Sequence, residues 1–283
     1  MKKILGSVGM LALVGALVWG ATGAFFSDTE TSTGNTFTAG AIDLTVDNTC
    51  YYNITAENGQ PNCPTQINNS ETTGIDESVV TSWTATNLGA QHKFFWFNDV
   101  KPGDFGEDTI SLHVDNDAWL RLVIKDVTDL DNSCTEPEGQ AEMKNPDGST
   151  STTPGCSTNG ELRESLLFSM WLDQGQTLGF QGKKSETNQT GDPGEGDNIR
   201  NFNEPTIISS GTIDPDGTAG NGVSEIWNLK DAGGLYLKGG ETAYFGIDWI
   251  LPGTVGNDTQ TDSMSATMEF QVQQHRNNST PIW

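Results

Sequence analysis

The sequence predicts an all-β fold, an antiparallel β-sandwich with long loop insertions. Apolar and polar residues alternate in several segments, which is the period of a strand with one buried face. Turn-forming residues separate these segments, and only one short stretch favours a helix. Short alternating strands joined by turns are typical of two antiparallel sheets packed face to face.

The chain begins with the features of a secretory signal peptide, predicted over residues 1–24. Two lysines precede an apolar stretch, which ends in small residues at Ala24. An uncleaved membrane anchor is the alternative, because the stretch approaches the length of a membrane span, but its glycines and small-residue exit favour cleavage. We therefore expect a secreted chain, extracellular or at the cell surface, that meets the membrane only during export. Its mature N-terminus would be Phe25-Phe26.

Six segments carry the alternation and are the predicted strands of the sandwich. In chain order they are AIDLTVD (41–47), TISLHVD (109–115), WLRLVIKDV (119–127), SLLFSMWLD (165–173), TAYFGIDWIL (242–251) and SATMEFQVQ (265–273). Side chains on a strand point alternately to its two faces. The apolar residues expected to face the core are Ile42, Leu44, Val46, Ile110, Leu112, Val114, Leu120, Leu122, Ile124, Leu166, Phe168, Met170 and Leu172.

Turns and one helical turn are predicted between these strands. KPGD (101–104), KGGE (238–241) and LPGT (251–254) combine residues that favour tight turns. GELRES (160–165) favours a short helical turn, and no longer helix is expected.

The predicted domain organisation is a single sandwich with insertions. An N-terminal segment (25–41) precedes the sandwich (42–274), and a C-terminal tail (275–283) follows it. Segments near 50–82 and 131–222 are rich in Asn, Thr, Gly, Asp and Pro, so they are interpreted as surface insertions. A small disulfide-stapled subdomain between strands is the alternative.

Charge restricts the partners of this chain. Lys and Arg number 14 against 38 Asp and Glu, which gives a formal net charge of -24. Such acidity argues against binding nucleic acid or anionic membranes, and favours either cations or a solvated, self-repelling surface.

Four cysteines behind a signal peptide predict two disulfides. Pairing of nearest neighbours is favoured, Cys50 with Cys63 and Cys134 with Cys156, although three connectivities are open. Each bridge would stabilise the fold by about 3 kcal/mol. Zinc ligation is the weaker alternative, because no two cysteines are close in sequence and no histidine has finger-like spacing.

Catalytic motifs are scarce. The three histidines form no H-E-x-x-H pair, and no G-x-S-x-G elbow is present. GFQGKKS (179–185) lacks both the first glycine and the Ser/Thr of a phosphate-binding loop. The carboxylates are scattered through loops, where solvated charge is expected rather than acid–base pairs. The sequence therefore predicts that the protein is not an enzyme.

Calcium is the one cofactor that the sequence suggests. DVTDLDN places Asp126, Asp129 and Asp131 near a strand end, and DPDGTAGNG (214–222) is a second acidic loop. Carboxylate and amide oxygens are the ligands that calcium takes, but neither segment has the EF-hand register, so a plain polar turn is the alternative in both places.

Three segments in this order resemble the TasA/camelysin family of secreted biofilm-matrix fibre proteins. They are GAFFSDTETSTGNTFTAGAIDLTVD (23–47), NDVKPGD (98–104) and DTISLHVDNDAWLRLVIKDV (108–127), and the final hairpin (239–274) is also similar. Phe37, Gly40, Ile42 and Leu44 match the family's first strand motif, whereas Val100 replaces its leucine before the KPGD turn. Residues 131–222 have no counterpart.

The resemblance implies a jelly-roll sandwich whose subunits polymerise by donor-strand exchange into fibres. In this chain the exchanged strand would be the N-terminal segment, with Phe25, Phe26 and Phe37 as apolar anchors. An extended Thr/Ser-rich segment gains main-chain hydrogen bonds on an open sheet edge. The expected partner is the chain itself, with other matrix or cell-surface components in addition. An ordinary first strand kept by its own sandwich is the alternative.

Two other functions remain open. A surface adhesin or carbohydrate-binding sandwich would use exposed aromatics such as Trp83, Trp96 or Trp171, although most sandwich tryptophans are core residues. Some camelysin-type members carry a metalloprotease label, but the three histidines here are far apart in sequence, so a zinc site gains no support.

Overall fold

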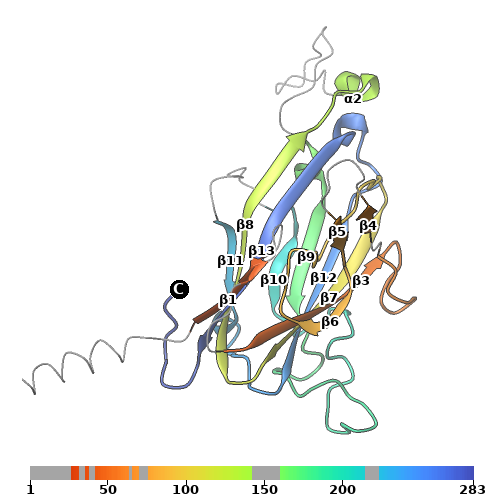
Figure 1. Cartoon of the computed structure of the whole chain (residues 1–283). Helices are drawn as coiled ribbons and strands as arrows, with labels where there is room; N and C mark the ends of the chain where they lie inside the picture. The colour runs from red at the N-terminus through yellow and green to blue at the C-terminus, as the bar shows by residue number, and fades with distance from the viewer. Residues whose placement is uncertain are drawn as a thin grey trace, which may run out of the picture.

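The chain folds into two β-sheets that face each other (Figure 1). The computed structural model describes residues 27–31, 36–37, 42–63, 66–69, 76–141, 160–213 and 223–283. The predicted signal peptide lies outside the described residues. Within the described part, no helix is long and apolar enough to cross a membrane.

The first sheet has five strands and carries the N-terminal strand near one edge. In spatial order these are β11 (Val223–Asn228), β8 (Ala118–Asp131), β13 (Asp262–Gln274), β1 (Ser27–Thr31) and β2 (Thr36–Phe37). The pairs from β11 to β1 are antiparallel, and β2 runs parallel to β1.

The second sheet has six antiparallel strands. Their order is β10 (Thr206–Gly211), β9 (Leu167–Leu172), β12 (Thr242–Ile250), β7 (Phe105–Val114), β3 (Leu44–Tyr52) and β6 (Trp83–Thr86). A separate hairpin is formed by β4 (Gln66–Asn69) and β5 (Asp76–Val79). Short helices are α2 (Glu136–Ala141), α3 (Leu162–Ser165), η1 (Leu229–Asp231) and η2 (Asn257–Thr259).

The core lies between the two sheets and is made by the alternating residues. Every inward-facing residue predicted from the sequence is buried, with exposed fractions of 8% or less. Phe245 on β12 and Phe270 on β13 meet across the interface with ring centroids 5.7 Å apart. The expectation of an all-β sandwich is therefore confirmed.

The predicted turns also form. In KPGD the amide of Asp104 donates to the Lys101 carbonyl, and Gly103 has a positive φ of 97°. In KGGE the amide of Glu241 donates to the Lys238 carbonyl, with Gly240 at φ 80°. Glycine suits both positions because it adopts positive φ without a steric penalty.

The segment 131–222 is not an insertion throughout. It contains β9, which was predicted as a strand, and β10, which was not, and both belong to the second sheet. Helix α3 was expected from GELRES, whereas α2 was missed. β10 escaped prediction because, as an edge strand with an exposed Ser-Ser-Gly end, it shows little alternation.

One disulfide joins Cys50 and Cys63, the nearest-neighbour pair. Cys134 is also disulfide-bonded, while Cys156 lies outside the described residues. The Cys50–Cys63 bridge ties the end of β3 to the loop that follows it.

Candidate functional site

The edge of the first sheet is where the N-terminal strand meets the sandwich. β1 pairs with β13 over five residues, from Ser27 opposite Gln273 to Thr31 opposite Glu269. β1 is SDTET, so it brings no apolar residue to this edge. The neighbouring strand β13 carries Phe270 and Val272, both fully buried. The contact of β1 therefore rests on main-chain pairing rather than on apolar anchoring.

The aromatic residues proposed as anchors flank this strand. Phe25 and Phe26 immediately precede β1 but lie outside the described residues. Phe37 lies in β2, where its backbone pairs with Glu30 and Thr31. In a single copy, then, β1 and β2 lie on their own sheet.

The three aspartates predicted to bind calcium do not form one site. Asp126 has a positive φ of 53°, next to a bulge in the β8–β13 pairing. Asp129 is instead engaged by Arg163, whose Nε lies 3.0 Å from its Oδ2, and both side chains are buried. Burial raises the pKa of Asp129, although the arginine opposes the shift. Asp129 is therefore paired with an arginine, and calcium binding by the three aspartates stays a prediction.

Asp131 belongs to a different group, with Glu138 and Asp262. Their ligand atoms lie within 4.8 Å of one another. Glu138 is fully buried and accepts hydrogen bonds from Thr135 and Thr261. Burial raises the pKa of Asp262 to about 6, while backbone amides of α3 donate to it. These are the described residues that could hold a divalent cation through oxygen ligands. Sequence proximity could not reveal them, because α2 and β13 are far apart in the chain.

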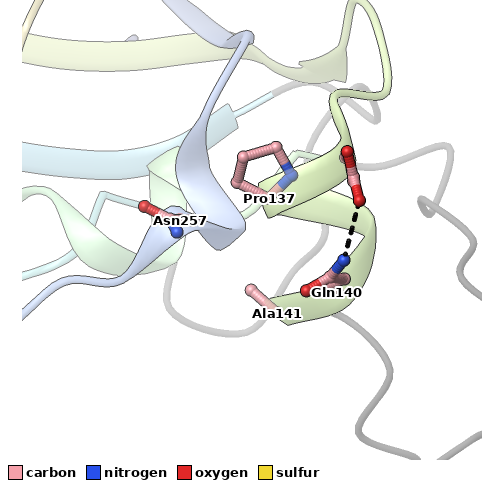
Figure 2. A pocket seen from close by; sticks show the side chains of 5 residues that line it. Pro137, Gln140, Ala141 and Asn257 are labelled. Atoms are coloured by element: carbon pink, nitrogen blue, oxygen red, sulfur yellow. Dashed lines mark hydrogen bonds between the residues drawn. The ribbon is translucent and has the colours of Figure 1, made fainter.

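A polar pocket is lined by residues of α2 and η2 (Figure 2). Pro137, Gln140 and Ala141 of α2 line one side and Asn257 of η2 the other, and Gln140 donates a 3.2 Å hydrogen bond to Glu136. The lining contains one carboxylate and neither histidine nor cysteine. It lacks the convergent acid and base groups of a catalytic cleft.

The three histidines lie in separate surroundings. His92 accepts a hydrogen bond from the Gly89 amide and packs on Trp83, and burial lowers its pKa. His113 bonds Asp47 on the second sheet. His275 stacks on Tyr236 at the end of the first sheet. In the described part of the chain, no group of three potential metal ligands includes a histidine.

The loop after β9 is organised by buried carboxylates rather than by regular structure. Asp173, Glu195 and Glu204 each accept two backbone amides, and Asp192 accepts three. Burial raises the pKa values of Asp173 and Glu195 to about 7. The loop also presents Phe202, which is completely exposed.

Of the tryptophans considered for ligand binding, Trp171 is buried, at 3% exposure. A Cβ added at Gly246 would come within 2.3 Å of its ring, so β12 packs directly on the indole. Trp83 is partly buried and packs on Phe94 in the core. Neither is an exposed binding residue, whereas Trp96, the third candidate, is partly exposed.

Comparison with known families locates the resemblance at the N-terminus. Residues 1–62 match the model of the camelysin metallo-endopeptidase family. The match includes the N-terminal segment and β3, and therefore the first of the three segments that resemble the TasA/camelysin family. No curated protein and no solved structure matches the chain.

Proposed function

We propose that this chain is an exported structural subunit that polymerises by exchanging its N-terminal segment between copies. In the fibre, β1 of one copy pairs with β13 of the next, in the register that it has on its own β13. The observation that carries the proposal is the position of β1 near the sheet edge, where main-chain pairing over five residues attaches it to β13.

An exchanged strand of identical sequence makes the same ladder in the same register. Exchange of an identical element between copies is a low-cost route to assembly. Without β1, the core strand β13 would present an unpaired edge, which is a template for another strand. The resemblance of residues 1–62 to camelysin and TasA-type proteins supports the same assembly.

Negative charge opposes this assembly. Subunits with a net charge of -24 repel one another when they stack, so salt or calcium should promote association by screening or bridging carboxylates. We expect fibre yield at low ionic strength to increase when either is added to the mature protein.

A pair of cysteines tests whether exchange occurs. Thr29 and Gln271 are direct partners in the register, and opposed Cβ atoms in an antiparallel pair lie about 4.5–5.5 Å apart, close enough for a disulfide after small adjustment. In fibres of the T29C/Q271C variant, exchange yields a covalent ladder of multimers on a non-reducing gel. Retention of the strand yields only internally bridged monomers, which would refute the proposal.

Two controls accompany this test. The T29C/Q273C variant, displaced by one diagonal position, should cross-link less because its Cβ atoms are farther apart. A mature chain lacking residues 25–37 should remain a monomer with unchanged circular dichroism. If that truncated chain still formed ordinary fibres in electron micrographs, the N-terminal segment could not be the link between subunits.

A further inference from the structure

Three aromatic side chains cluster where β13 ends. Tyr236 and His275 stack with centroids 3.9 Å apart and planes tilted by 13°. Trp119 lies against both, 4.4 Å from His275 and 6.0 Å from Tyr236. Trp119 is buried, whereas Tyr236 and His275 are only partly buried. The stacked pair is therefore partly open to solvent.

The C-terminal tail, residues 275–283, holds this cluster in place. The backbone amide of Ile282 donates a 3.0 Å hydrogen bond to the side-chain oxygen of Gln273. The Trp119 indole donates to the Asn278 carbonyl at 2.6 Å, and Lys230 donates to the Ser279 carbonyl. The tail is thus a strap across the outer face of the first sheet (Figure 1). Such bonding orders the aromatic cluster before any ligand arrives.

The register of β1 leads to this cluster. Ser27 is opposite Gln273, and antiparallel pairing moves one residue back along β1 for each residue forward along β13. Continued for two further residues, the same register would bring Phe26 and Phe25 opposite Gln274 and His275. Both phenylalanines lie outside the described residues.

We propose that the Tyr236–His275 pair is a docking site for the N-terminal phenylalanines of a neighbouring copy, with Phe25 on the stacked rings. This inference rests on the proposed strand exchange and names the surface that receives the end of the exchanged strand. Because β1 itself is entirely polar, it offers no apolar anchor. The docking site gives that role to the two phenylalanines that precede it.

The face of the sheet agrees with this occupant. Gln273 is paired with Trp119, so their side chains share one face, and the His275 ring lies against Trp119 with centroids 4.4 Å apart. A residue opposite His275 therefore lies on the aromatic side of the sheet. In the exchanged ladder, Phe26 would be opposite Gln274 and therefore on the other side, which is the side of the fully buried Ala118. One phenylalanine would thus add to each face at the end of the ladder.

The first test measures coupling between the two partners in the full mature chain. Both F25A/F26A and Y236A should raise the critical concentration for fibre formation about tenfold or more, the effect of losing a buried aromatic contact. In the triple variant, Y236A should add little, because its partner is already gone. F202A, which removes a fully exposed phenylalanine elsewhere, should leave the critical concentration unchanged. Independent, additive effects would overturn the inference.

The second test locates the contact directly and leaves Tyr236 and His275 unchanged. A photoreactive benzoylphenylalanine at position 25 is cross-linked in fibres assembled from equal parts of isotopically heavy and light chains. Mass spectrometry should find heavy–light cross-links to the peptides that contain Tyr236 or His275. Heavy–light cross-links to other surfaces would overturn the docking site while leaving strand exchange intact. Fibres whose cross-links join only residues of one chain, together with a failed T29C/Q271C ladder, would refute the exchange itself.

Discussion

Replacing Asp108 by asparagine should remove part of the pH dependence of folding. Asp108 is fully buried on β7, where its Oδ1 accepts a 2.8 Å hydrogen bond from the Asn48 amide. Its Oδ2 has no hydrogen-bond partner, and neither does Asn48 Oδ1. Burial raises the pKa of Asp108 well above its usual value. A proton on Asp108 supplies the donor that this pair of buried acceptors otherwise lacks.

The magnitude follows from proton linkage. The pKa of Asp108 is raised in the folded state. The contribution of the protonated carboxyl to stability is therefore complete below the unfolded-state pKa, and it is lost progressively as the pH rises from there through the folded-state pKa. While the folded group holds a proton that the unfolded group has released, the free energy of unfolding falls by about 1.4 kcal/mol per pH unit. The D108N variant keeps the acceptor for Asn48 and does not titrate. The free energy of unfolding of D108N, relative to that of wild type, should therefore increase by about 1.4 kcal/mol for each pH unit above pH 5.

Urea unfolding of the monomeric mature chain, followed by tryptophan fluorescence between pH 4 and 7, measures this difference. D262N provides the comparison, because burial raises the pKa of Asp262 only to about 6. Its difference from wild type should grow between pH 4 and 6 and then level off. Plots of stability against pH that run parallel for wild type and D108N would refute the reasoning about Asp108.

Three further substitutions test the packing of the sandwich. Replacing Cys50 and Cys63 with serine should lower the free energy of unfolding by about 3 kcal/mol, measured by urea titration; an unchanged midpoint would mean that the bridge contributes nothing. Gly246→Ala should cost at least about 1–3 kcal/mol, because the added Cβ would come within 2.3 Å of an indole ring on β9; a melting temperature equal to that of wild type would contradict this close packing. Arg163→Leu should cost about 3–5 kcal/mol by leaving the Asp129 carboxylate buried without Arg163. The double variant R163L/D129L should recover much of this loss, measured by urea titration; a double variant as unstable as R163L would contradict the reasoning.

The sandwich was predictable because its signal is local. Alternation such as Ile42, Leu44, Val46 reports which face of a strand is buried, and all six predicted strands form in the structure. Turns were equally accessible, since Gly103 and Gly240 occupy positions whose backbone conformation favours glycine. β10 and α2 carry no such pattern, so their existence depended on the elements against which they pack.

Some features of the candidate sites could likewise be recognised from the sequence, and others could not. The resemblance at residues 1–62 and the polar N-terminal strand could be recognised from consecutive residues. The carboxylate group of Asp131, Glu138 and Asp262 could not, and neither could the pairing of Asp129 with the buried Arg163. Which charged side chains pair depends on their distance in the folded chain, and the order of residues does not give that distance.

By itself, the sequence determined the class of fold, the faces of its strands and the polar character of the stretch that forms β1, because each depends on residues close together in the chain. Only the tertiary structure decided that β1 pairs with β13 and that this register leads towards Tyr236 and His275. It also decided that the C-terminal tail straps this face of the sheet. These relations join residues from opposite ends of the chain, and they are set by the closure of the sandwich, which brings the first and last strands side by side.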